Sequence, residues 1–467
     1  MLTSFHLQNF KSFRQDAVLP LSSLTVLIGA NAAGKSNALE GLRFLSWLAQ
    51  GNKLSAIQHA VNQANKVVRG RIPDIFQQGE SRFALGCTMD AIPGASQLDM
   101  ELELRVDDLH IVSERMGMGA GVPLYEMDQP SSASQGQGTE TSVAYNPFSD
   151  EQGALPRIPV SDQMAVFAQL DSPASFHAKN KQAQQQIPQA CKRYQEVLSN
   201  ILFLDPVPAK MRDFSFLANK QLGDDGVNLS SVLFRLWYGG ADAAKHYALE
   251  QLEKERSLGG DADFLPTDLS AERQEILSFI QSLPEQDIQG LSFLKGPRND
   301  VMVQLIESFG GVRRAYEAAL LSDGTLRVLA IAAAMLSAPE GSLVVIEEID
   351  NGVHPSRARH LLERIQAVAE RRQLRVLLST HNPAMLDALP DKAVPDVVFC
   401  YRDPVLGDSR LIRLGDLPDA PDLLLQDTLG RLMTTGALER FVKNRQGPQV
   451  RQEKALAWLA SLQANEP

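Results

Sequence analysis

The sequence is poor in cysteine, and its three cysteines lie far apart in the chain. A zinc site or a disulfide framework needs cysteines at short, paired spacings, and none of these spacings is present. We therefore expect three inert thiols and a cytoplasmic protein. The cysteines are Cys87, Cys191 and Cys400.

A long apolar run is also missing. The longest one, at residues 328–336, is soon followed by Pro339 and Glu340, and it is far shorter than the ~20 apolar residues that cross a bilayer. The N-terminus lacks the basic start and apolar core of a secretory signal. These absences predict no membrane span and no membrane partner, in keeping with a cytoplasmic location.

The sequence also lacks an excess of positive charge, because its 45 basic side chains are outnumbered by 56 acidic ones and the formal net charge is -11. Non-specific nucleic-acid binding depends mostly on neutralising phosphates, so this balance argues against a protein coated for that purpose. Basic stretches at 66–71 and at Arg313 and Arg314 leave a local patch open, although such stretches are usually solvated surface. Direct DNA binding therefore stays an open alternative.

The sequence does contain a strand, a glycine-rich loop and a helix in succession. Residues 24–28 form a β-rich apolar run, and apolar residues recur at helical spacing from 38 to 48. The loop between them, GANAAGKS at 29–36, fits the phosphate-loop pattern at every fixed position. In such a loop the backbone N–H groups surround the phosphates of ATP, the lysine reaches the β- and γ-phosphates, and the serine ligates Mg²⁺. The residues assigned to nucleotide binding are Gly29, Asn31, Gly34, Lys35, Ser36 and Asn37.

A second apolar strand pattern, at residues 343–346, ends in an acidic pair. Beside a bound nucleotide, Glu347 is expected to hold Mg²⁺ and Glu348 to polarise the attacking water. Most proteins of this type have aspartate at the first position, so Glu347 is a departure with a side chain one methylene longer. An acidic pair at the end of a strand more often belongs to a solvated loop. The presence of a phosphate loop in the same chain favours the catalytic interpretation here.

The order of these patterns predicts an α/β fold. Strands at 24–28, 343–346 and 375–378 are flanked by helical patterns, which implies a mixed, mainly parallel sheet with its ligand chemistry at the carboxyl ends of the strands. The phosphate loop and the acidic pair lie near opposite ends of the chain, so the nucleotide domain is expected to be discontinuous. Its predicted parts are residues 1–100 and 295–425.

The rest of the chain is interpreted as helical. Residues 101–294 are predicted to be an inserted, mostly helical region, and residues 426–467 a helical C-terminal tail. Within the insertion, the polar stretch at 128–142 cannot bury enough apolar surface to order itself and is expected to be mobile.

Further motifs resemble those of ABC-type ATPases. Residues 320–325, LLSDGT, lie shortly before the acidic strand and resemble the signature loop of that family. On their own they would be a helix cap. In the family this loop closes over the γ-phosphate held by a second subunit, so the resemblance implies a homodimer that sandwiches ATP.

Two other motifs follow in the order that this family shows. Residues 350–352 resemble the D-loop, and the STHNP sequence at 379–383 resembles the segment of the switch histidine, which contacts the γ-phosphate. The glutamine loop corresponds to Gln77 or Gln78. The resemblance thus adds Ser322, Gly324 and Asp350 to the nucleotide-binding residues, gives Glu348, His381 and Lys35 as catalytic residues, and gives Ser36, Glu347 and Gln78 as metal ligands.

Within this superfamily the chain resembles the SMC/RecF/OLD-like branch. The resemblance rests on NFKSF at 9–13, on EEIDNGVHP at 347–355 and on STHNP at 379–383. The sequence after His381 is too short for the complete Toprim nuclease domain of OLD proteins, and the chain has no sustained heptads for an SMC-type arm. A compact P-loop NTPase with an ABC/SMC-like head is therefore expected, similar to bacterial ATPases encoded beside a small effector protein, including in anti-phage defence modules.

Three functions compete on this basis. The leading hypothesis is a dimerising switch that binds ATP and Mg²⁺, hydrolyses ATP to ADP and phosphate, and passes its nucleotide state to an effector protein or to DNA. The second is a self-contained DNA repair or recombination ATPase of the RecF kind. The third is a transporter ATPase subunit, against which the long insertion between phosphate loop and signature loop speaks.

Overall fold

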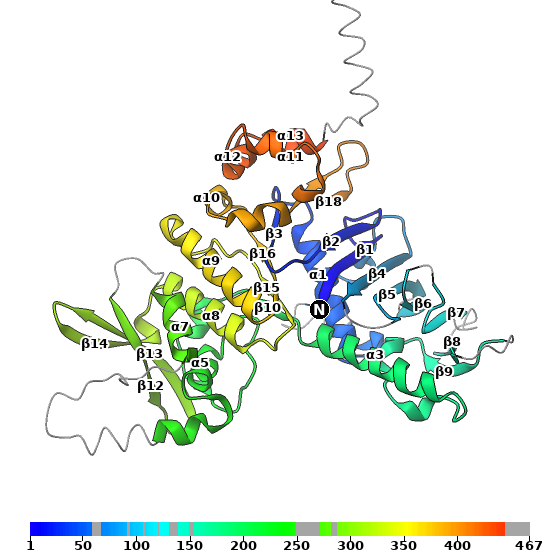
Figure 1. The fold of residues 1–467 in the computed structure, drawn as a ribbon, viewed down its shortest axis with the longest axis horizontal. Helices are drawn as coiled ribbons and strands as arrows, with labels where there is room; N and C mark the ends of the chain where they lie inside the picture. The colour runs from blue at the N-terminus through cyan, green and yellow to red at the C-terminus, as the bar shows by residue number, and fades with distance from the viewer. Residues whose placement is uncertain are drawn as a thin grey trace, which may run out of the picture.

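The fold is described by a computed structural model, which covers residues 1–57, 67–90, 94–105, 108–119, 121–129, 139–148, 154–248, 271–281 and 287–443 (Figure 1). None of the helices in these ranges combines the length and the apolarity needed to cross a bilayer. Residues 130–138 of the predicted mobile stretch and residues 444–467 of the predicted tail lie outside the described residues.

A six-stranded sheet forms the centre of the molecule. The strand order is β10-β15-β16-β3-β17-β18, and every neighbouring pair is parallel except β17 and β18. This confirms the predicted mixed, mainly parallel sheet. The strands are β3 (Thr25–Ile28), β10 (Leu202–Leu204), β15 (Leu343–Ile346), β16 (Arg375–Ser379), β17 (Val397–Arg402) and β18 (Ser409–Arg413).

The central sheet separates two hydrophobic cores. Successive side chains of a strand point to opposite faces, so Val26 and Ile28 enter one core while Leu27 enters the other. The first core also contains the helices α8 (Asp323–Ser337) and α9 (Pro355–Arg371). The second contains α1 (Lys35–Ala49) and α3 (Lys181–Ser199), so the helix after the phosphate loop is buried along its apolar side.

An eight-stranded antiparallel sheet packs on the side of α1, in the order β2-β1-β4-β5-β6-β7-β8-β9. Its strands are β1 (Leu2–Gln8), β2 (Ala17–Pro20), β4 (Arg82–Met89), β5 (Gln97–Arg105), β6 (Asp108–Gly117), β7 (Tyr125–Gln129), β8 (Glu140–Tyr145) and β9 (Arg157–Ser161). The predicted boundary at residue 100 therefore falls inside β5.

This sheet corrects the prediction of a mostly helical insertion, because the described part of residues 101–161 is dominated by strands. The physical reason is visible in β5, where Leu98, Met100 and Leu102 are buried and alternate with acidic residues. A period of two is typical of a strand with one buried face. The later part of the insertion contains helices, as expected.

A smaller lobe lies on the opposite side of the central sheet from the antiparallel sheet (Figure 1). It combines α5 and α7 with a four-stranded sheet, in which β12 and β14 both pair with β13. The predicted boundary at residue 295 is wrong here, since it separates the paired strands β12 and β13. The elements are α4 (Pro208–Met211), α5 (Leu229–Trp237), α7 (Ala271–Ile280), β11 (Ser215–Phe216), β12 (Ile288–Lys295), β13 (Asp300–Phe309) and β14 (Val312–Glu317).

The described chain after β18 is mostly helical, and of the predicted helical tail at 426–467 the structure describes residues 426–443. Its helices follow β18, beside α10 (Figure 1). They are α11 (Ala420–Leu424), α12 (Leu429–Thr434) and α13 (Ala437–Lys443), whereas α10 (Pro383–Asp387) precedes β17 in the chain.

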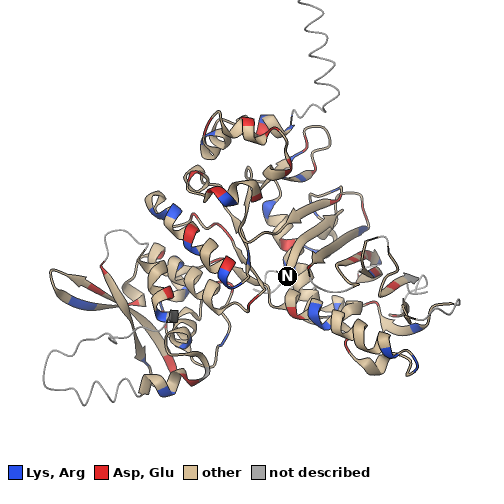
Figure 2. Ribbon diagram, viewed as in Figure 1, with Lys and Arg blue, Asp and Glu red and all other residues tan. Residues whose placement is uncertain are grey.

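Charged residues of both signs are interspersed along the larger helices (Figure 2). Arg313 and Arg314 belong to β14, and this strand lies at the outer end of the smaller lobe, remote from the central sheet (Figure 1). All three cysteines are buried, and burial raises the pKa of each thiol, that of Cys400 to about 12. Since the thiolate is the reactive form, the expectation of inert thiols is supported.

A buried carboxyl group stabilises the antiparallel sheet against the segment that follows it. Glu114 of β6 is fully buried and accepts hydrogen bonds from the Tyr125 hydroxyl (2.7 Å) and from the backbone N–H groups of Val166 (2.7 Å) and Phe167 (2.8 Å). Burial raises the pKa of Glu114 to about 7, although all three donors oppose the shift. The folded state therefore binds a proton more tightly than the unfolded state.

This raised pKa predicts a pH-dependent stability. The contribution of Glu114 is fully present below its ordinary pKa of 4.5 and is lost as the pH rises through about 7. In Glu114→Gln nothing titrates at this position. The unfolding free energy of the parental protein, relative to that variant, should therefore fall by about 2 to 3 kcal/mol between pH 5 and pH 8. Urea titrations at both pH values measure the difference, and a constant difference would contradict the assignment.

Candidate functional site

The glycine-rich loop connects β3 to α1 at the carboxyl end of the central sheet. Gly29 has φ +145°, and a Cβ atom there would lie 2.1 Å from the Cys400 carbonyl oxygen. Gly34 has φ +120°, and a Cβ atom there would lie 2.3 Å from the Ser409 hydroxyl. Both positions therefore exclude a side chain. The loop is held close to β17 and β18, and its backbone is free to face a ligand.

The helix that follows offers its positive end to this loop. α1 begins at Lys35, and its first turn contains no acidic residue. The free N–H groups and the dipole at a helix N-terminus favour an anion such as a phosphate. Lys35 donates from Nζ to the carbonyl oxygens of Gly29 (2.7 Å) and Ala30 (3.2 Å), and burial lowers its pKa below the usual value.

A pocket of about 380 Å³ opens beside the loop and brings together residues from both ends of the chain. Eight of the predicted site residues line it: Asn31, Gly34, Lys35, Ser36, Asn37, Glu347, Glu348 and His381. Among the predicted residues, Gly29, Gln78, Ser322, Gly324 and Asp350 are not part of this lining. The sequence thus anticipated the meeting of the phosphate loop with the acidic pair.

The acidic pair follows β15 and is held by its neighbours. Glu348 has φ +48°, an uncommon conformation for a residue other than glycine. Its backbone N–H donates to the Ser379 hydroxyl (3.0 Å), and its Oε2 accepts a hydrogen bond from the Asn351 amide (2.6 Å). Glu347 accepts at Oε1 from Arg43 Nη2 (3.1 Å). Burial raises the pKa of the Glu347 carboxyl, and the Arg43 guanidinium opposes that shift.

The switch-histidine segment follows the neighbouring strand β16. His381 is half exposed, and its Nδ1 lies 3.7 Å from Asp350 Oδ2. Asp350 has a side chain that is 5% exposed, and its Oδ1 accepts a hydrogen bond from the Thr380 hydroxyl (2.6 Å). Within one chain, Asp350 therefore connects the ends of β15 and β16 and supports His381, while it stays outside the lining of the pocket.

The signature-like residues lie at the start of α8. Ser322 caps this helix by accepting a hydrogen bond from the Thr325 N–H (3.1 Å). Gly324 packs so closely on the D-loop segment that a Cβ atom there would lie 2.3 Å from the Gly352 carbonyl oxygen. Neither Ser322 nor Gly324 lines the pocket of its own chain. They form a separate surface next to Leu320, which is 73% exposed.

Neither Gln77 nor Gln78, the two candidates for the glutamine loop, lines the pocket. Gln78 is exposed and does not line the pocket. The side-chain oxygen of Gln77 is buried and has no hydrogen-bond partner among the described residues. A buried oxygen without a partner is costly unless a ligand or water satisfies it.

Several residues of the site were not anticipated from the sequence. Arg402 lines the pocket from the end of β17 and donates from Nε to the Ala32 carbonyl oxygen (3.0 Å). Its position at the carboxyl end of a parallel strand is a sequence feature that could have identified Arg402 as a site residue. Arg69 also lines the pocket, although the basic stretch 66–71 was interpreted as surface. Ser379 and Thr380 complete the unpredicted polar lining.

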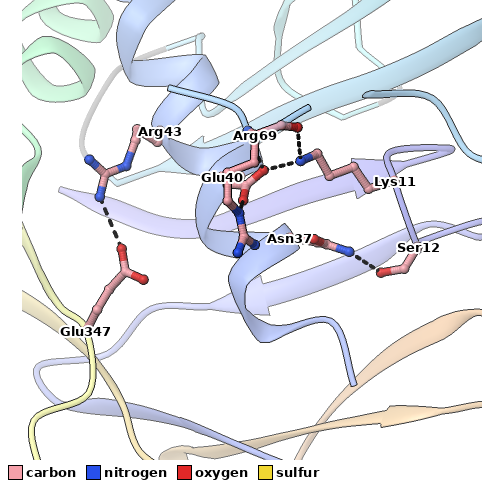
Figure 3. Close-up of polar contacts among 7 residues, drawn as sticks. All are labelled: Lys11, Ser12, Asn37, Glu40, Arg43, Arg69 and Glu347. Atoms are coloured by element: carbon pink, nitrogen blue, oxygen red, sulfur yellow. Dashed lines mark hydrogen bonds and ion pairs between the residues drawn. The ribbon is translucent and has the colours of Figure 1, made fainter. Parts of the chain in front are cut away.

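Arg69 is held by a carboxylate of α1. Glu40 forms ion pairs with Arg69 and with Lys11, and Lys11 Nζ also donates to the Arg69 carbonyl oxygen (2.8 Å) (Figure 3). In the same view Asn37 donates to the Ser12 hydroxyl (2.7 Å). Through Lys11 and Ser12, the N-terminal motif NFKSF therefore contacts side chains of α1, the helix that begins at the phosphate loop.

The oxygen donors at this pocket fit a magnesium ion that arrives with a nucleotide. Ser36 and Glu347 both line the pocket. No group of three or more His, Cys, Asp or Glu side chains is arranged to hold a metal within the described ranges. Mg²⁺ usually takes one or two protein ligands together with phosphate oxygens and waters. The site therefore suits Mg²⁺ bound to a phosphate chain.

Comparisons with known proteins agree with this geometry. Residues 1–87 match the family described as "AAA ATPase domain", and residues 183–387 match the family described as "AAA domain, putative AbiEii toxin, Type IV TA system". Two curated relatives are both described as "DNA replication and repair protein RecF". The protein of Thermosynechococcus vestitus is 30% identical over 106 residues, which are 22% of this chain and 23% of the relative. The protein of Nostoc punctiforme is 28% identical over 101 residues, which are 22% of this chain and 23% of the relative.

These curated matches span less than a quarter of each relative's length. Among solved structures, a SmcHead bound to the C-winged helix domain of ScpA aligns with a TM-score of 0.46 at 11% identity, over 88% of this chain and 96% of that one. A Smc head domain from Pyrococcus furiosus aligns with a TM-score of 0.42 at 12% identity, over 91% and 98%. Two separate parts of the chain thus match ATPase-domain families, and about a fifth of the chain is similar to RecF, which supports the resemblance to RecF-like ABC-type ATPases.

Proposed function

We propose that this protein binds ATP with Mg²⁺ and hydrolyses it to ADP and phosphate. The observation that carries the proposal is the single pocket in which Lys35 and Ser36 of the phosphate loop meet Glu347, Glu348 and His381. These are the parts that phosphoryl transfer requires, namely a phosphate cradle, oxygen ligands for a metal, and a carboxylate near the attacking water.

Each residue has a proposed role. Lys35 leaves the loop carbonyl oxygens and binds the β- and γ-phosphates, and Ser36 and Glu347 hold Mg²⁺, which neutralises charge on the phosphate oxygens when bound. Glu348 orients the attacking water and accepts its proton. His381, supported by Asp350, donates a hydrogen bond to the γ-phosphate.

Phosphate release from ATP by the purified protein, with and without Mg²⁺, tests this proposal directly. We expect Mg²⁺-dependent release together with saturable binding of a fluorescent ATP analogue. A protein that binds no nucleotide at any Mg²⁺ concentration would overturn the proposal.

We also propose that two copies assemble around ATP. Ser322 and Gly324 are absent from the pocket of their own chain, and the exposed Leu320 beside them leaves this surface open to a partner. In the closed dimer the start of α8 of one copy covers the nucleotide held by the other. A C2 assembly of this kind contains two equivalent sites.

Mixing two inactive variants is a test of this dimer. Lys35→Ala removes the phosphate-binding cation, and Ser322→Arg obstructs the surface at the start of α8, at a cost in cap energy of about 1 kcal/mol. Each variant alone should be nearly inactive. A mixture should recover activity, because a mixed dimer contains one site with an intact phosphate loop and an intact partner surface. Equal inactivity of the mixture would contradict a shared site.

The finer role that we propose is a cytoplasmic switch whose nucleotide state acts on an effector protein, in a defence system. It is supported by the family match whose description names a toxin–antitoxin system. The RecF similarity supports a second candidate, a DNA repair ATPase. Double-stranded DNA that stimulates ATP hydrolysis by the isolated protein would favour the second candidate, and stimulation that requires a co-purified protein would favour the first. The charge balance of -11 gives the DNA candidate the weaker support.

A further inference from the structure

Arg43 is a charged residue enclosed next to the pocket. It belongs to α1, seven positions after Ser36, and its side chain is only 15% exposed. Arginine is rarely so enclosed unless its guanidinium is paired. Figure 3 shows this group pointing from the helix toward Glu347.

Three partners fix the guanidinium plane. Nη2 donates to Glu347 Oε1 (3.1 Å), Nη1 donates to Asp224 Oδ2 (2.5 Å), and the group lies over the Phe203 ring at 4.4 Å from its centroid. A planar fork with two carboxylate partners and an aromatic face has a defined orientation, which a lysine ammonium would not reproduce.

Backbone hydrogen bonds connect the segments that carry these side chains. The Glu347 N–H donates to the Leu204 carbonyl oxygen (2.9 Å), and the Asp205 N–H donates to the Asp224 carbonyl oxygen (2.8 Å). Phe203 and Leu204 belong to β10, the strand next to β15. Arg43 therefore spans from the phosphate-loop helix to Glu347 and to the turn at 223–226, all of them fastened to the end of β10.

These contacts restrict the conformation of the Glu347 side chain. Glutamate has one more rotatable bond than the aspartate that is usual at this position, so an unrestrained Glu347 would spread over more rotamers. The side chains that hydrogen-bond to metal ligands orient them, and their loss typically lowers metal affinity by about 10- to 100-fold.

We propose that Arg43 is a positioning residue that orients Glu347 for Mg²⁺ and ties it to residues 223–226. This inference rests on the proposed ATPase function and adds to it a residue that acts through Glu347. Two opposing effects follow from removing Arg43. Loss of a nearby cation would by itself strengthen Mg²⁺ binding at Glu347, whereas loss of orientation weakens it. The sign of the change therefore reports which effect dominates.

The test is a Mg²⁺ titration of the full chain at a saturating concentration of a non-hydrolysable ATP analogue. The readout is the Mg²⁺ concentration that gives half of the rise in Tm, and Mg²⁺-dependent phosphate release from ATP is measured in parallel. In Arg43→Gln we expect this Mg²⁺ midpoint to rise about 10-fold. In Arg43→Lys, which keeps the charge but loses the fork, we expect a similar rise.

Two further variants are measured in the same way: Asp224→Asn as a second test and Arg359→Gln as a control. Asp224 is largely exposed, so its variant keeps the fold while it weakens one arm of the fork, and we expect a smaller rise in the Mg²⁺ midpoint. Arg359 is an exposed residue of α9 that pairs with Glu363, so its variant loses a comparable charge away from the pocket and should keep the parental midpoint.

A midpoint that is unchanged or lower in the Arg43 variants would overturn the inference. If the Arg43 variants do not fold, Asp224→Asn decides, and an unchanged midpoint in that variant has the same meaning. If the parental protein shows the Mg²⁺ response and the Arg43 variants show a raised Mg²⁺ midpoint, yet the parental protein releases no phosphate, the proposed hydrolysis would be refuted and the role of Arg43 would stand.

Discussion

Glu348→Gln is expected to lower ATP turnover at least about 100-fold, because a general base typically contributes a factor of that size or more. Glutamine has the same shape and still accepts a hydrogen bond from Asn351, which donates to Glu348 Oε2 at 2.6 Å. It cannot accept a proton from the attacking water. ATP binding should therefore survive, and the closed dimer should accumulate.

Two measurements check this expectation. Phosphate release gives the turnover, and light scattering after gel filtration with ATP and Mg²⁺ gives the mass of the trapped species. Glu340→Gln makes the same chemical change at an exposed residue before β15 and should behave like the parental protein. Turnover at the parental rate in Glu348→Gln would assign the water-activating role to another residue.

Lys35→Ala is expected to abolish tight nucleotide binding. Without a ligand, Lys35 Nζ donates to the carbonyl oxygens of Gly29 and Ala30, and these contacts are exchanged for phosphate oxygens when ATP binds. Truncating one partner of a buried, hydrogen-bonded charge pair costs about 2 to 5 kcal/mol. The Kd for ATP should therefore rise by at least about 30-fold.

Isothermal titration with ATP and Mg²⁺ measures that change. Alanine is a good helix former at the start of α1, so the far-ultraviolet circular dichroism of the variant should match that of the parental protein. Lys392→Ala, at an exposed lysine, is the matched control and should keep the parental Kd. A parental Kd in Lys35→Ala would place the triphosphate outside the phosphate loop.

The nucleotide-binding half of the fold was predictable because its signals are local and dense. β3, β15 and β16 were each visible as short apolar runs bounded by polar loops, and a parallel sheet brings such strand ends to one edge. The meeting of Lys35 with Glu348 followed from that rule.

The antiparallel sheet was missed because its strands are interrupted by polar turns and its signal is weak in each strand. β5 is the exception, because the alternation of Leu98, Met100 and Leu102 with acidic residues is a strand signal that the sequence does contain. The roles of Arg43 and Arg69 could not be predicted in the same way. Their partners, Asp224 and Glu40 respectively, are set by packing between elements, and no local pattern identifies them.

The position of β3 in the central sheet governs when this protein can fold. β3 lies between β16 and β17, strands that the ribosome makes some 350 residues later. During synthesis, the phosphate-loop strand therefore emerges early with both of its edges unpaired, and unpaired strand edges are prone to aggregation. Because Arg402 lines the nucleotide pocket, the nascent chain can complete this pocket only after residue 402 has left the exit tunnel.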